Sequence, residues 1–254
     1  MWHGDTLFLL WNLVQKDFKI RYRNMSLGMF WSLLNPLVMM TVLTFVFTKL
    51  LGAGNPVEYA LSVLCGLVPF NFFALSVATA TGSLNENSQL IKRVPVPREI
   101  VPVATVLSNG LHVIIQFGLV FAAVIVFGRG ITIHWLWLPV LMFLELVFIC
   151  GVSLATSALN VFVRDMRYVV ESANTVLFYL VPIFYSWTII PQKYVAIYQA
   201  NPLAALILSV RKILIDGQAP LGSTMINLTI AAFGTLGLGW LLFQSVKKRF
   251  YEYL

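Results

Sequence analysis

Charged residues are sparse along this chain, and the long uncharged runs between them predict its architecture. There are six such runs, and only one of them is interrupted by a charged residue, Glu145. Each is longer than the roughly 20 apolar residues that a helix needs to cross a hydrocarbon core. We therefore predict an all-α membrane protein with six transmembrane helices, at residues 24–48, 59–85, 100–128, 135–163, 168–192 and 222–246.

A further uncharged run, residues 194–210, is too short to be counted as a seventh span. Asn201-Pro202 lies at its middle, and an internal proline disfavours a straight helix. Six spans with a cytoplasmic N-terminus place 12 of the 17 Lys and Arg residues inside and 5 outside, which agrees with the positive-inside rule. We predict that both termini are cytoplasmic and that residues 194–215 form a re-entrant or interfacial hairpin on the outer side.

The first 23 residues have the pattern of an amphipathic helix. One face is apolar and consists of Leu7, Leu10, Trp11, Val14, Phe18 and Tyr22. The other face is polar and consists of Asn12, Gln15, Lys16, Lys19 and Arg23. The basic residues follow the apolar stretch instead of preceding it, so a signal peptide is disfavoured. We predict an interfacial helix at residues 1–23 that turns its basic side chains toward lipid phosphates.

The longest polar loop on the predicted cytoplasmic side covers residues 86–99. It contains an apolar pair, Leu90-Ile91, and ends in Pro95 and Pro97. An asparagine at its start can cap a short helix, which the prolines would then end. No segment is long and polar enough for a separate globular domain, so residues 1–254 are expected to form one transmembrane domain.

Composition excludes several classes of function. Hydrophobic residues make up 59% of the chain and charged residues 11%, against about 25% charged in soluble domains. The net charge of +7 comes from residues dispersed among membrane loops, which disfavours nucleic acid as a partner. Cys65 and Cys150 lie in apolar spans, where neither a disulfide framework nor a metal site is indicated. No phosphate-binding loop, paired-aspartate motif or His-x-x-x-His is present, so we expect no catalytic site.

Two ionisable residues lie well away from the ends of the predicted spans, Glu145 and His112. A charged acid at this depth is costly unless it faces protein or water. Glu145 is therefore either a polar point on a transport path or, as we favour, a protonated or hydrogen-bonded acid that holds helices together. His112 is expected to be a packed, neutral histidine rather than a ligand.

Several short motifs, taken in order, resemble the permease subunit of ABC exporters for O-antigen, capsule or teichoic-acid polymers. The resemblance extends over nearly the whole chain. The motifs are Lys16 to Arg23 (KDFKIRYR), Leu27-Gly28 with Trp31 and Leu34-Asn35-Pro36, Gly66 to Phe73 (GLVPFNFF), Leu90 to Arg93 (LIKR) with Pro97 to Pro102 (PREIVP), Leu159 to Asp165 (LNVFVRD), Pro182 to Tyr185 (PIFY), Asn201-Pro202-Leu203 and Arg211 to Leu214 (RKIL).

The resemblance implies a division of labour between subunits. The permease would be a homodimer in the cytoplasmic (inner) membrane and would bind two copies of a separate ABC ATPase. ATP and Mg²⁺ would be bound by that partner, so no cofactor is expected in this chain. The cargo would be a polysaccharide linked to undecaprenyl diphosphate, with the polymer passing between the protomers and its anchor at the boundary with membrane lipid.

The same resemblance suggests site residues. The cytoplasmic loop would couple to the ATPase through Leu90, Ile91, Lys92, Arg93 and Arg98. Arg21 and Arg23, at headgroup depth, are candidates for binding the lipid diphosphate, because a guanidinium pairs two phosphate oxygens; generic attraction to anionic lipid is the alternative. The candidates for lining the translocation path are Phe30, Trp31, Phe70, Phe72, Phe73 and Glu145.

Two other functions stay open on the sequence alone. A permease of the same architecture can export a drug or a lipid without a polymer. A membrane glycosyltransferase or acyltransferase belongs to a different class, and the lack of clustered acids and histidines disfavours it. The identity and length of the glycan do not follow from the sequence, nor does the choice among O-antigen, capsule and teichoic acid.

Overall fold

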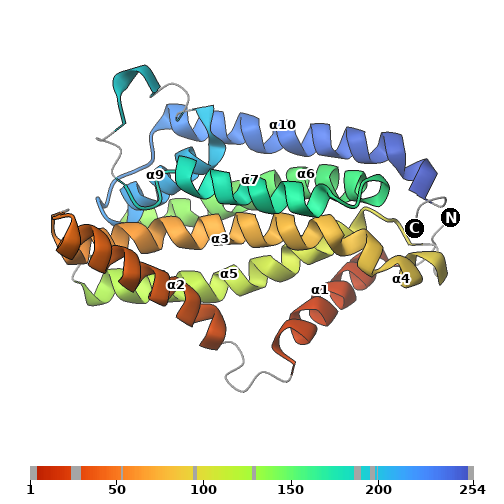
Figure 1. Cartoon of the computed structure of the whole chain (residues 1–254), viewed down its shortest axis with the longest axis horizontal. Coiled ribbons are helices and arrows are strands. Elements are labelled where there is room, and N and C mark those ends of the chain that lie inside the picture. Colours follow the sequence, from red (N-terminus) through yellow and green to blue (C-terminus); the bar gives the residue numbers. More distant parts are fainter. Residues whose placement is uncertain are drawn as a thin grey trace.

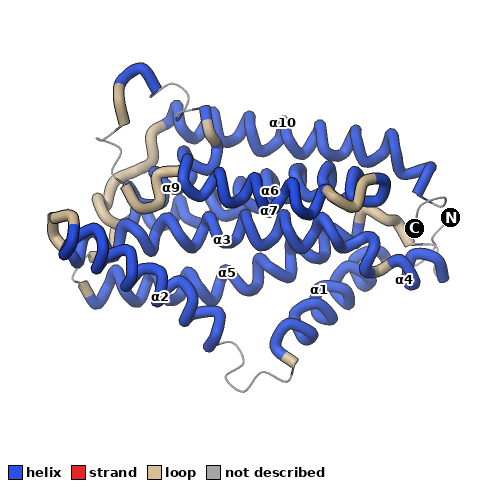
Figure 2. The backbone as a smooth tube through the Cα atoms, viewed as in Figure 1, coloured by secondary structure: helices blue, strands red, loops and turns tan. Residues whose placement is uncertain are grey.

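The computed structural model describes residues 5–23, 30–52, 54–93, 96–127, 130–185, 190–194, 198 and 200–250, and this part of the chain is helical without strands (Figure 2). The all-α prediction is therefore confirmed for these residues. Within the described residues, five helical segments are long and apolar enough to cross a membrane, and they coincide with five of the six predicted spans. They are Phe30–Leu50, Pro56–Glu86, Ile100–Val126, Ile133–Phe162 and Gly222–Arg249.

The helices lie side by side along the long axis of the molecule, which gives the bundle two ends (Figure 1). At the end that we call proximal, α1 (Thr6–Tyr22) begins, α4 (Ser88–Arg93) lies, and α10 (Gly222–Val246) ends. At the opposite, distal end lie α9 (Pro202–Leu214) and the beginning of α10. The chain therefore returns to the end at which its described part began.

The central element is α3 (Pro56–Glu86), which is buried along most of its length. Its start is set by Asn55, whose side chain accepts a hydrogen bond from the Val57 amide at 3.0 Å, and by Pro56, which suits the first helical turn. α5 (Ile100–Val126) and α6 (Leu138–Phe162) pack against it. Because α3 is apolar on every side, it forms the core of the bundle rather than a lipid-facing wall.

Two glycines allow α6 and α10 to pack at very short distance. A Cβ added to Gly239 of α10 would lie 2.0 Å from the carbonyl oxygen of Gly151 on α6. One added to Gly151 would lie 2.4 Å from the backbone nitrogen of Leu236. No side chain larger than hydrogen fits at either position, so the two backbones are in direct contact, as at small-residue interfaces between membrane helices.

The first membrane-length helix stands apart from the core. α2 (Phe30–Thr44) continues into the π-helical turn η1 (Phe45–Leu50), and only Pro36 is buried in these two elements. Asn35-Pro36 was expected to kink this span or mark its start; Pro36 lies inside α2. Residues 24–29 of the predicted span lie outside the described residues. The exposed apolar surface of α2 is available to lipid or to another protein.

The predicted fifth span, residues 168–192, is helical over a shorter range than expected. α7 (Met166–Leu180) ends at Leu180, and Val181 has an extended backbone with φ −85° and ψ 139°. Pro182 explains this end, since a proline disfavours the helical conformation of the residue before it. The 15 residues of α7 extend roughly 22 Å. The uncharged run thus overestimated the length of the helix. Residues 186–189 of the predicted span lie outside the described residues.

The predicted outer segment, residues 194–215, begins at the last residue of the short 3₁₀ turn η4 (Gln192–Tyr194) and contains α9. The side chain of Asn201 accepts a hydrogen bond from the Leu203 amide at 3.0 Å, and Pro202 occupies the first turn. Nine of the 13 residues of α9 are buried, and they pack against α3, α6 and α10. Asn201-Pro202 thus begins a helix instead of breaking one. Residues 195–197 and 199 lie outside the described part, and the re-entrant hairpin stays a prediction.

Candidate functional site

A row of polar contacts joins α1 to α5, and we call it the α1–α5 seam. Asp17 accepts a hydrogen bond from Thr105 at 3.1 Å, and Arg21 donates one to the side-chain oxygen of Asn109. Tyr22 and His112 form a third pair, with their rings stacked at 6.2 Å between centroids. Residue numbers rise together on the two helices, so α1 runs along the first half of α5. Asp17, Arg21 and Tyr22 of α1 therefore contact protein.

The two arginines proposed to bind lipid diphosphate have different surroundings. Arg21 is partly buried in the seam, where burial lowers the pKa of its guanidinium while Tyr22 and Asp17 raise it. Arg23 is exposed at the end of α1. The structure does not bring the two side chains into one described site. The helix predicted at residues 1–23 is present as Thr6–Tyr22, whereas its position relative to the lipid surface stays a prediction.

His112 extends the seam to α2. Its Nδ1 atom lies 2.5 Å from the Tyr22 hydroxyl, and its Nε2 atom lies 3.2 Å from Nε2 of Gln116. Gln116 also donates a hydrogen bond to the carbonyl oxygen of Ser32 at 2.9 Å. Both ring nitrogens of His112 thus have protein partners, which fits the packed histidine expected from the sequence.

The predicted coupling pair does not lie free at the surface. Ile91 is 6% exposed and belongs to an apolar cluster with Leu13, Val14 and Leu84, while Leu90 is half-buried against the same cluster. α4 is instead exposed through basic side chains. An ATPase contact through Ile91 would require this side chain to leave the packing of its own chain.

The basic residues of the coupling segment divide into two groups. Lys92 and Arg93 are exposed on α4. Arg98 donates a hydrogen bond to the Lys247 carbonyl at 2.5 Å, and its guanidinium lies 5.7 Å from the ring centroid of Phe250. Only the first pair is thus presented to a partner. Pro95 lies outside the described residues.

A polar cavity at the proximal end is lined by none of the predicted site residues. It measures about 600 Å³ and lies between the end of α3 and the corner that joins α6 to α7. An ion pair of 3.1 Å between Arg167 and Glu86 links the two sides. Arg164 and Asp165, which the sequence placed only in a motif, line the same cavity. The sequence feature that could have indicated this cavity is the pair of charged residues directly after a long apolar run.

The residues expected to line a translocation path are not gathered along one surface. Phe70, Phe72 and Phe73 are each at most 5% exposed and belong to the core of the protomer. Phe70 packs edge-on against Phe178, and Phe73 stacks on Phe148. These three rings cannot contact a polymer in this conformation, because the surrounding helices cover them.

The other path candidates lie elsewhere. Phe30 and Trp31 are exposed at the start of α2. Glu145 is 2% exposed inside α6, and within the described part of the chain its Oε1 atom has no hydrogen-bond partner. Among the described residues, no three His, Cys, Asp or Glu side chains are close enough together to hold a metal ion.

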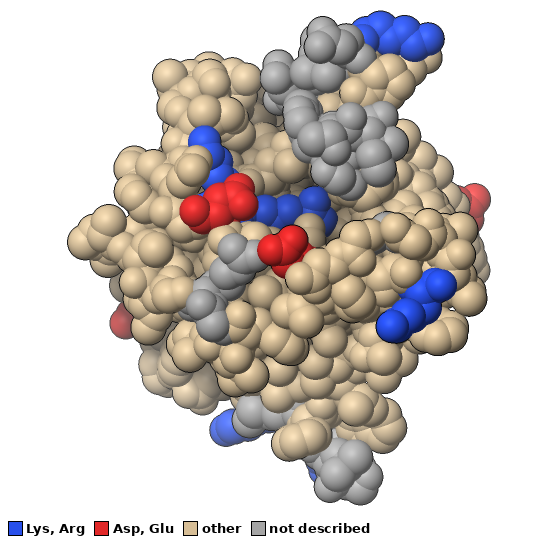
Figure 3. All heavy atoms as spheres, turned by 90° about the vertical axis from the view of Figure 1, so that its left-hand side faces the viewer, with Lys and Arg blue, Asp and Glu red and all other residues tan. Residues whose placement is uncertain are grey.

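A large cavity opens at the distal end, and we call it the distal cavity. It measures about 870 Å³ and lies between the start of α3, residues 183–185, α9 and the start of α10. Basic and acidic side chains gather at a hollow on this face of the molecule, which is otherwise mostly uncharged (Figure 3). Sequence reasoning placed Arg211 and Lys212 in a motif but assigned them no role. The sequence feature that could have indicated this cavity is a pair of basic residues beside an apolar segment.

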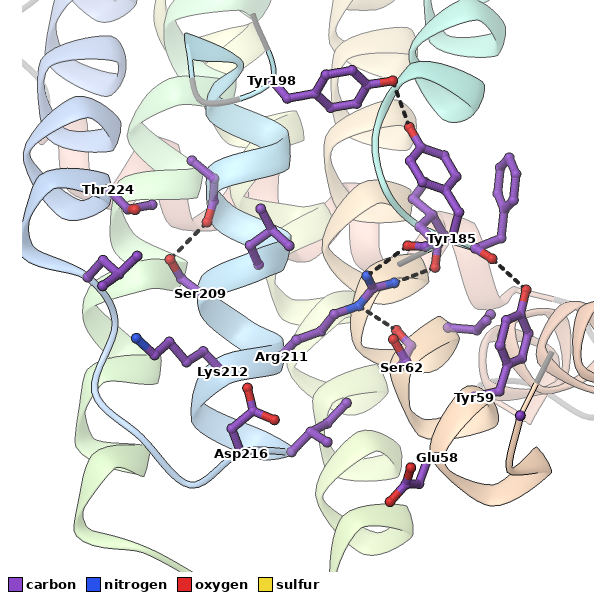
Figure 4. A pocket seen from close by; sticks show the side chains of 18 of the residues that line it. Glu58, Tyr59, Ser62, Tyr185, Tyr198, Ser209, Arg211, Lys212, Asp216 and Thr224 are labelled. Carbon is purple, nitrogen blue, oxygen red and sulfur yellow. Dashed lines mark hydrogen bonds between the residues drawn. The ribbon is translucent and has the colours of Figure 1, made fainter. Parts of the chain in front are cut away.

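One wall of the distal cavity is held by a half-buried arginine, Arg211 (Figure 4). Arg211 of α9 donates hydrogen bonds to the carbonyl oxygens of Ser62 at 3.0 Å, Ile183 at 2.5 Å and Tyr185 at 3.5 Å. Tyr59 of α3 donates a hydrogen bond to the Phe184 carbonyl at 2.6 Å. The bonds to residues 183–185 fix the non-helical segment that follows α7, and they satisfy carbonyls that no helix pairs.

Comparison with known proteins gives consistent matches. Residues 9–215 match the family model described as ABC-2 type transporter. The chain is 33% identical to an O-antigen export system permease protein, RfbA, of Klebsiella pneumoniae, over 99% of this chain and 96% of that protein. It is 26% identical to the RfbA permease of Myxococcus xanthus over 96% and 94% of the two chains. It is 22% identical to the polysialic acid transport protein KpsM of Escherichia coli over 92% and 91%.

Proposed function

The chain belongs to the ABC-2 type transporter family, and from this premise we propose that it is the membrane subunit that exports a lipid-linked polysaccharide across the cytoplasmic membrane. The cargo we propose is an O-antigen-like polymer carried on undecaprenyl diphosphate. The observation that carries the proposal is the similarity to O-antigen permeases along 99% of the chain, at 33% identity. A match of this extent covers both ends of the bundle.

We propose further that a separate ATPase drives transport and that two copies of the permease form the path. The chain contains no phosphate-binding loop, so ATP hydrolysis requires another subunit. The interior of the single protomer supports the second point. Its aromatic core residues, Phe70, Phe72 and Phe73, lie on α3 and are buried against the neighbouring helices, and this leaves no room there for a polymer.

In the topology we propose, α7 makes the fifth of six crossings and the proximal end is cytoplasmic. α7 runs alongside the other helices from the proximal toward the distal end (Figure 1). Six crossings return the chain to its starting side, in agreement with the common position of the start of α1 and the end of α10. The division of Lys and Arg residues supports the same orientation. The distal cavity would then open to the outer side.

The proposal is tested by co-purifying the permease with the ATPase encoded beside it and measuring ATP hydrolysis in lipid nanodiscs. Lipid-linked glycan from the source strain should stimulate hydrolysis, and deleting the permease gene should abolish surface glycan. Free undecaprenyl phosphate is the matched control ligand without sugar. If drugs or plain lipids stimulate hydrolysis and the lipid-linked glycan does not, the protein is an exporter of the same architecture for another cargo.

A further inference from the structure

We propose that the distal cavity is a saccharide-binding site formed within a single protomer. It has a volume of about 870 Å³, within the range of about 300–1,000 Å³ that is typical of small-molecule sites. It is built by α3, α9, α10 and the segment after α7, so no second copy is needed to complete it. The inference deepens the proposed function and rests on it, because the sugar would come from the exported polymer.

The lining has the chemistry that sugar rings require. Tyr59, Tyr185 and Tyr198 contribute aromatic side chains, on whose faces the C–H groups of a pyranose can pack. On the α10 side the cavity is lined by Ser223, Thr224 and Asn227, whose hydroxyl and amide groups both donate and accept hydrogen bonds. A wall that combines aromatic faces with such groups matches a ligand with many hydroxyl groups.

The charges around the cavity favour a neutral sugar over a phosphate. Two basic residues, Arg211 and Lys212, are balanced by two acidic ones, Glu58 and Asp216. Arg211 already donates to three backbone carbonyls, which leaves its guanidinium occupied. A site for a phosphate would instead show an excess of available positive charge. The balanced charges are suited to hydroxyl groups, which accept from a cation and donate to a carboxylate.

Two charged side chains are available to a ligand. Lys212 and Asp216 lie four residues apart, yet in the described part of the chain neither side chain forms an ion pair or a hydrogen bond. Figure 4 shows the Lys212 amine directed toward α10 and the Asp216 carboxylate lying between Lys212 and Arg211. Lys212 is half-buried and Asp216 is exposed. A charged group that is partly removed from water gains most from a polar ligand.

The frame around these side chains is fixed in advance. Arg211 and Tyr59 hold residues 183–185 through their carbonyls, and the Tyr185 hydroxyl donates to the Tyr198 hydroxyl at 3.1 Å. Little ordering is then needed when a sugar enters, which lowers the cost of binding. In the proposed topology this site would hold the glycan at the outer end of the permease.

Site-specific photo-crosslinking in cells that make their own glycan tests the inference. A benzoylphenylalanine at Thr224 would project into the cavity, whereas one at Ile226, two residues along the same helix and 61% exposed, would project away from it. After irradiation, the Thr224 variant should form a ladder of permease bands that reacts with antiserum against the glycan. The Ile226 variant and a strain without glycan should give background only. Asn227, which also lines the cavity, is a second probe position if the Thr224 variant does not fold.

Substitution of the available charges gives an independent readout. Lys212→Gln and Asp216→Asn should each lower the cross-linking yield about tenfold, the effect of losing one charge-assisted hydrogen bond. Lys193→Gln, the same change at an exposed lysine that does not line the cavity, should leave the yield unchanged. Equal yields in all three variants would overturn the site.

The outcomes also separate this inference from the proposed function. If probe-bearing permeases export glycan normally and no glycan cross-links at Thr224 or Asn227, the site is wrong and the export function stands. Equal cross-linking at Thr224 and Ile226 would likewise show glycan passing without a built site. If the unmodified permease with its ATPase exports no glycan, the proposed function itself fails.

Discussion

Single glycines determine how closely two membrane helices of this protein approach. Gly239→Ala should force α6 and α10 apart, because the added Cβ would lie 2.0 Å from the Gly151 carbonyl oxygen. Overpacking of this kind costs about 1–3 kcal/mol. The expected result is a lower melting temperature of the purified permease in detergent, measured by intrinsic fluorescence.

Gly237→Ala is the matched control for this change. Gly237 lies two residues before Gly239 on the same helix, and a Cβ added there meets no atom within 4 Å. Alanine should be neutral or slightly stabilising at that position, since it has the higher helix propensity. Equal melting temperatures for Gly239→Ala and Gly237→Ala would show that the two backbones are not in contact.

At the same scale, Arg23 gives a sharper test of diphosphate binding than Arg21. Arg23→Lys keeps the charge but removes the planar fork, so bidentate pairing with the lipid diphosphate is lost. Surface glycan should fall about tenfold, the cost of one charged hydrogen bond, while membrane insertion is unchanged. The measurement is quantitative staining of glycan on whole cells.

Arg21→Lys serves as the comparison for this prediction, because it also disturbs the hydrogen bond to Asn109 and should lower the melting temperature as well. Arg23→Lys should leave the melting temperature alone. Normal export by the Arg23→Lys variant would mean that this arginine only attracts anionic lipid, as the alternative reading of the sequence holds.

Among the elements, α4 has one face packed inward and one face available to a partner. Exchanging the exposed Lys92 and Arg93 for Glu should weaken binding of the ATPase, because rim charges guide and orient an encounter. The fraction of ATPase that co-purifies should fall at both low and moderate salt. The melting temperature of the permease should stay constant.

Ile91→Asp is the contrasting variant. It places a charge in the apolar cluster that contains Leu13 and Leu84 and should destabilise the permease itself. If the double charge reversal binds the ATPase normally, the contact lies elsewhere, and the cavity lined by Arg164 and Arg167 is the next candidate.

The elements were largely predictable, because the absence of charge over 20 residues is a physical requirement for crossing lipid. Their ends were less so. The run that ends at Gln192 is uncharged beyond Leu180, yet Pro182 ends α7 there. The lack of charge shows that a segment can lie in lipid, whereas a proline shows where the hydrogen bonding of a helix stops. Asn201-Pro202 misled in the opposite sense, since a capping asparagine and a first-turn proline begin a helix.

The candidate sites were harder to predict than the elements. Phe70, Phe72 and Phe73 lie on a helix that is apolar on all sides, so nothing in the pattern shows which face a polymer could reach. The α1–α5 seam depends on residues about 90 positions apart, and the distal cavity joins four elements. Such contacts arise from tertiary packing, which a local pattern does not encode.

For the molecule as a whole, the proposed orientation places the two ends of the bundle in different compartments. A cysteine at Gln218, which is exposed at the distal end, should react with a membrane-impermeant maleimide added outside intact cells. The native Cys65 and Cys150 are buried and should not interfere. The measurement is the mass shift of the labelled permease on a gel.

A cysteine at Lys248, exposed at the end of α10, is the control with the opposite expectation. It should label only in inside-out vesicles, because the proximal end faces the cytoplasm in the proposed topology. Labelling of Gln218→Cys in inside-out vesicles alone would reverse the orientation. Labelling of both positions from the same side would place the two ends of α10 in one compartment, and six crossings would be wrong.

The α1–α5 seam also has a consequence for the order in which the protein is made. Arg21 leaves the ribosome 88 residues before its partner Asn109. At about 5–20 residues per second, this interval lasts roughly 4 to 18 s. During that time α1 has basic and apolar side chains but no helix to pair with, and the membrane surface is the nearest surface that suits both. The interfacial helix expected from the sequence is thus a natural precursor of the seam, with lipid contacts exchanged for protein contacts when α5 is inserted.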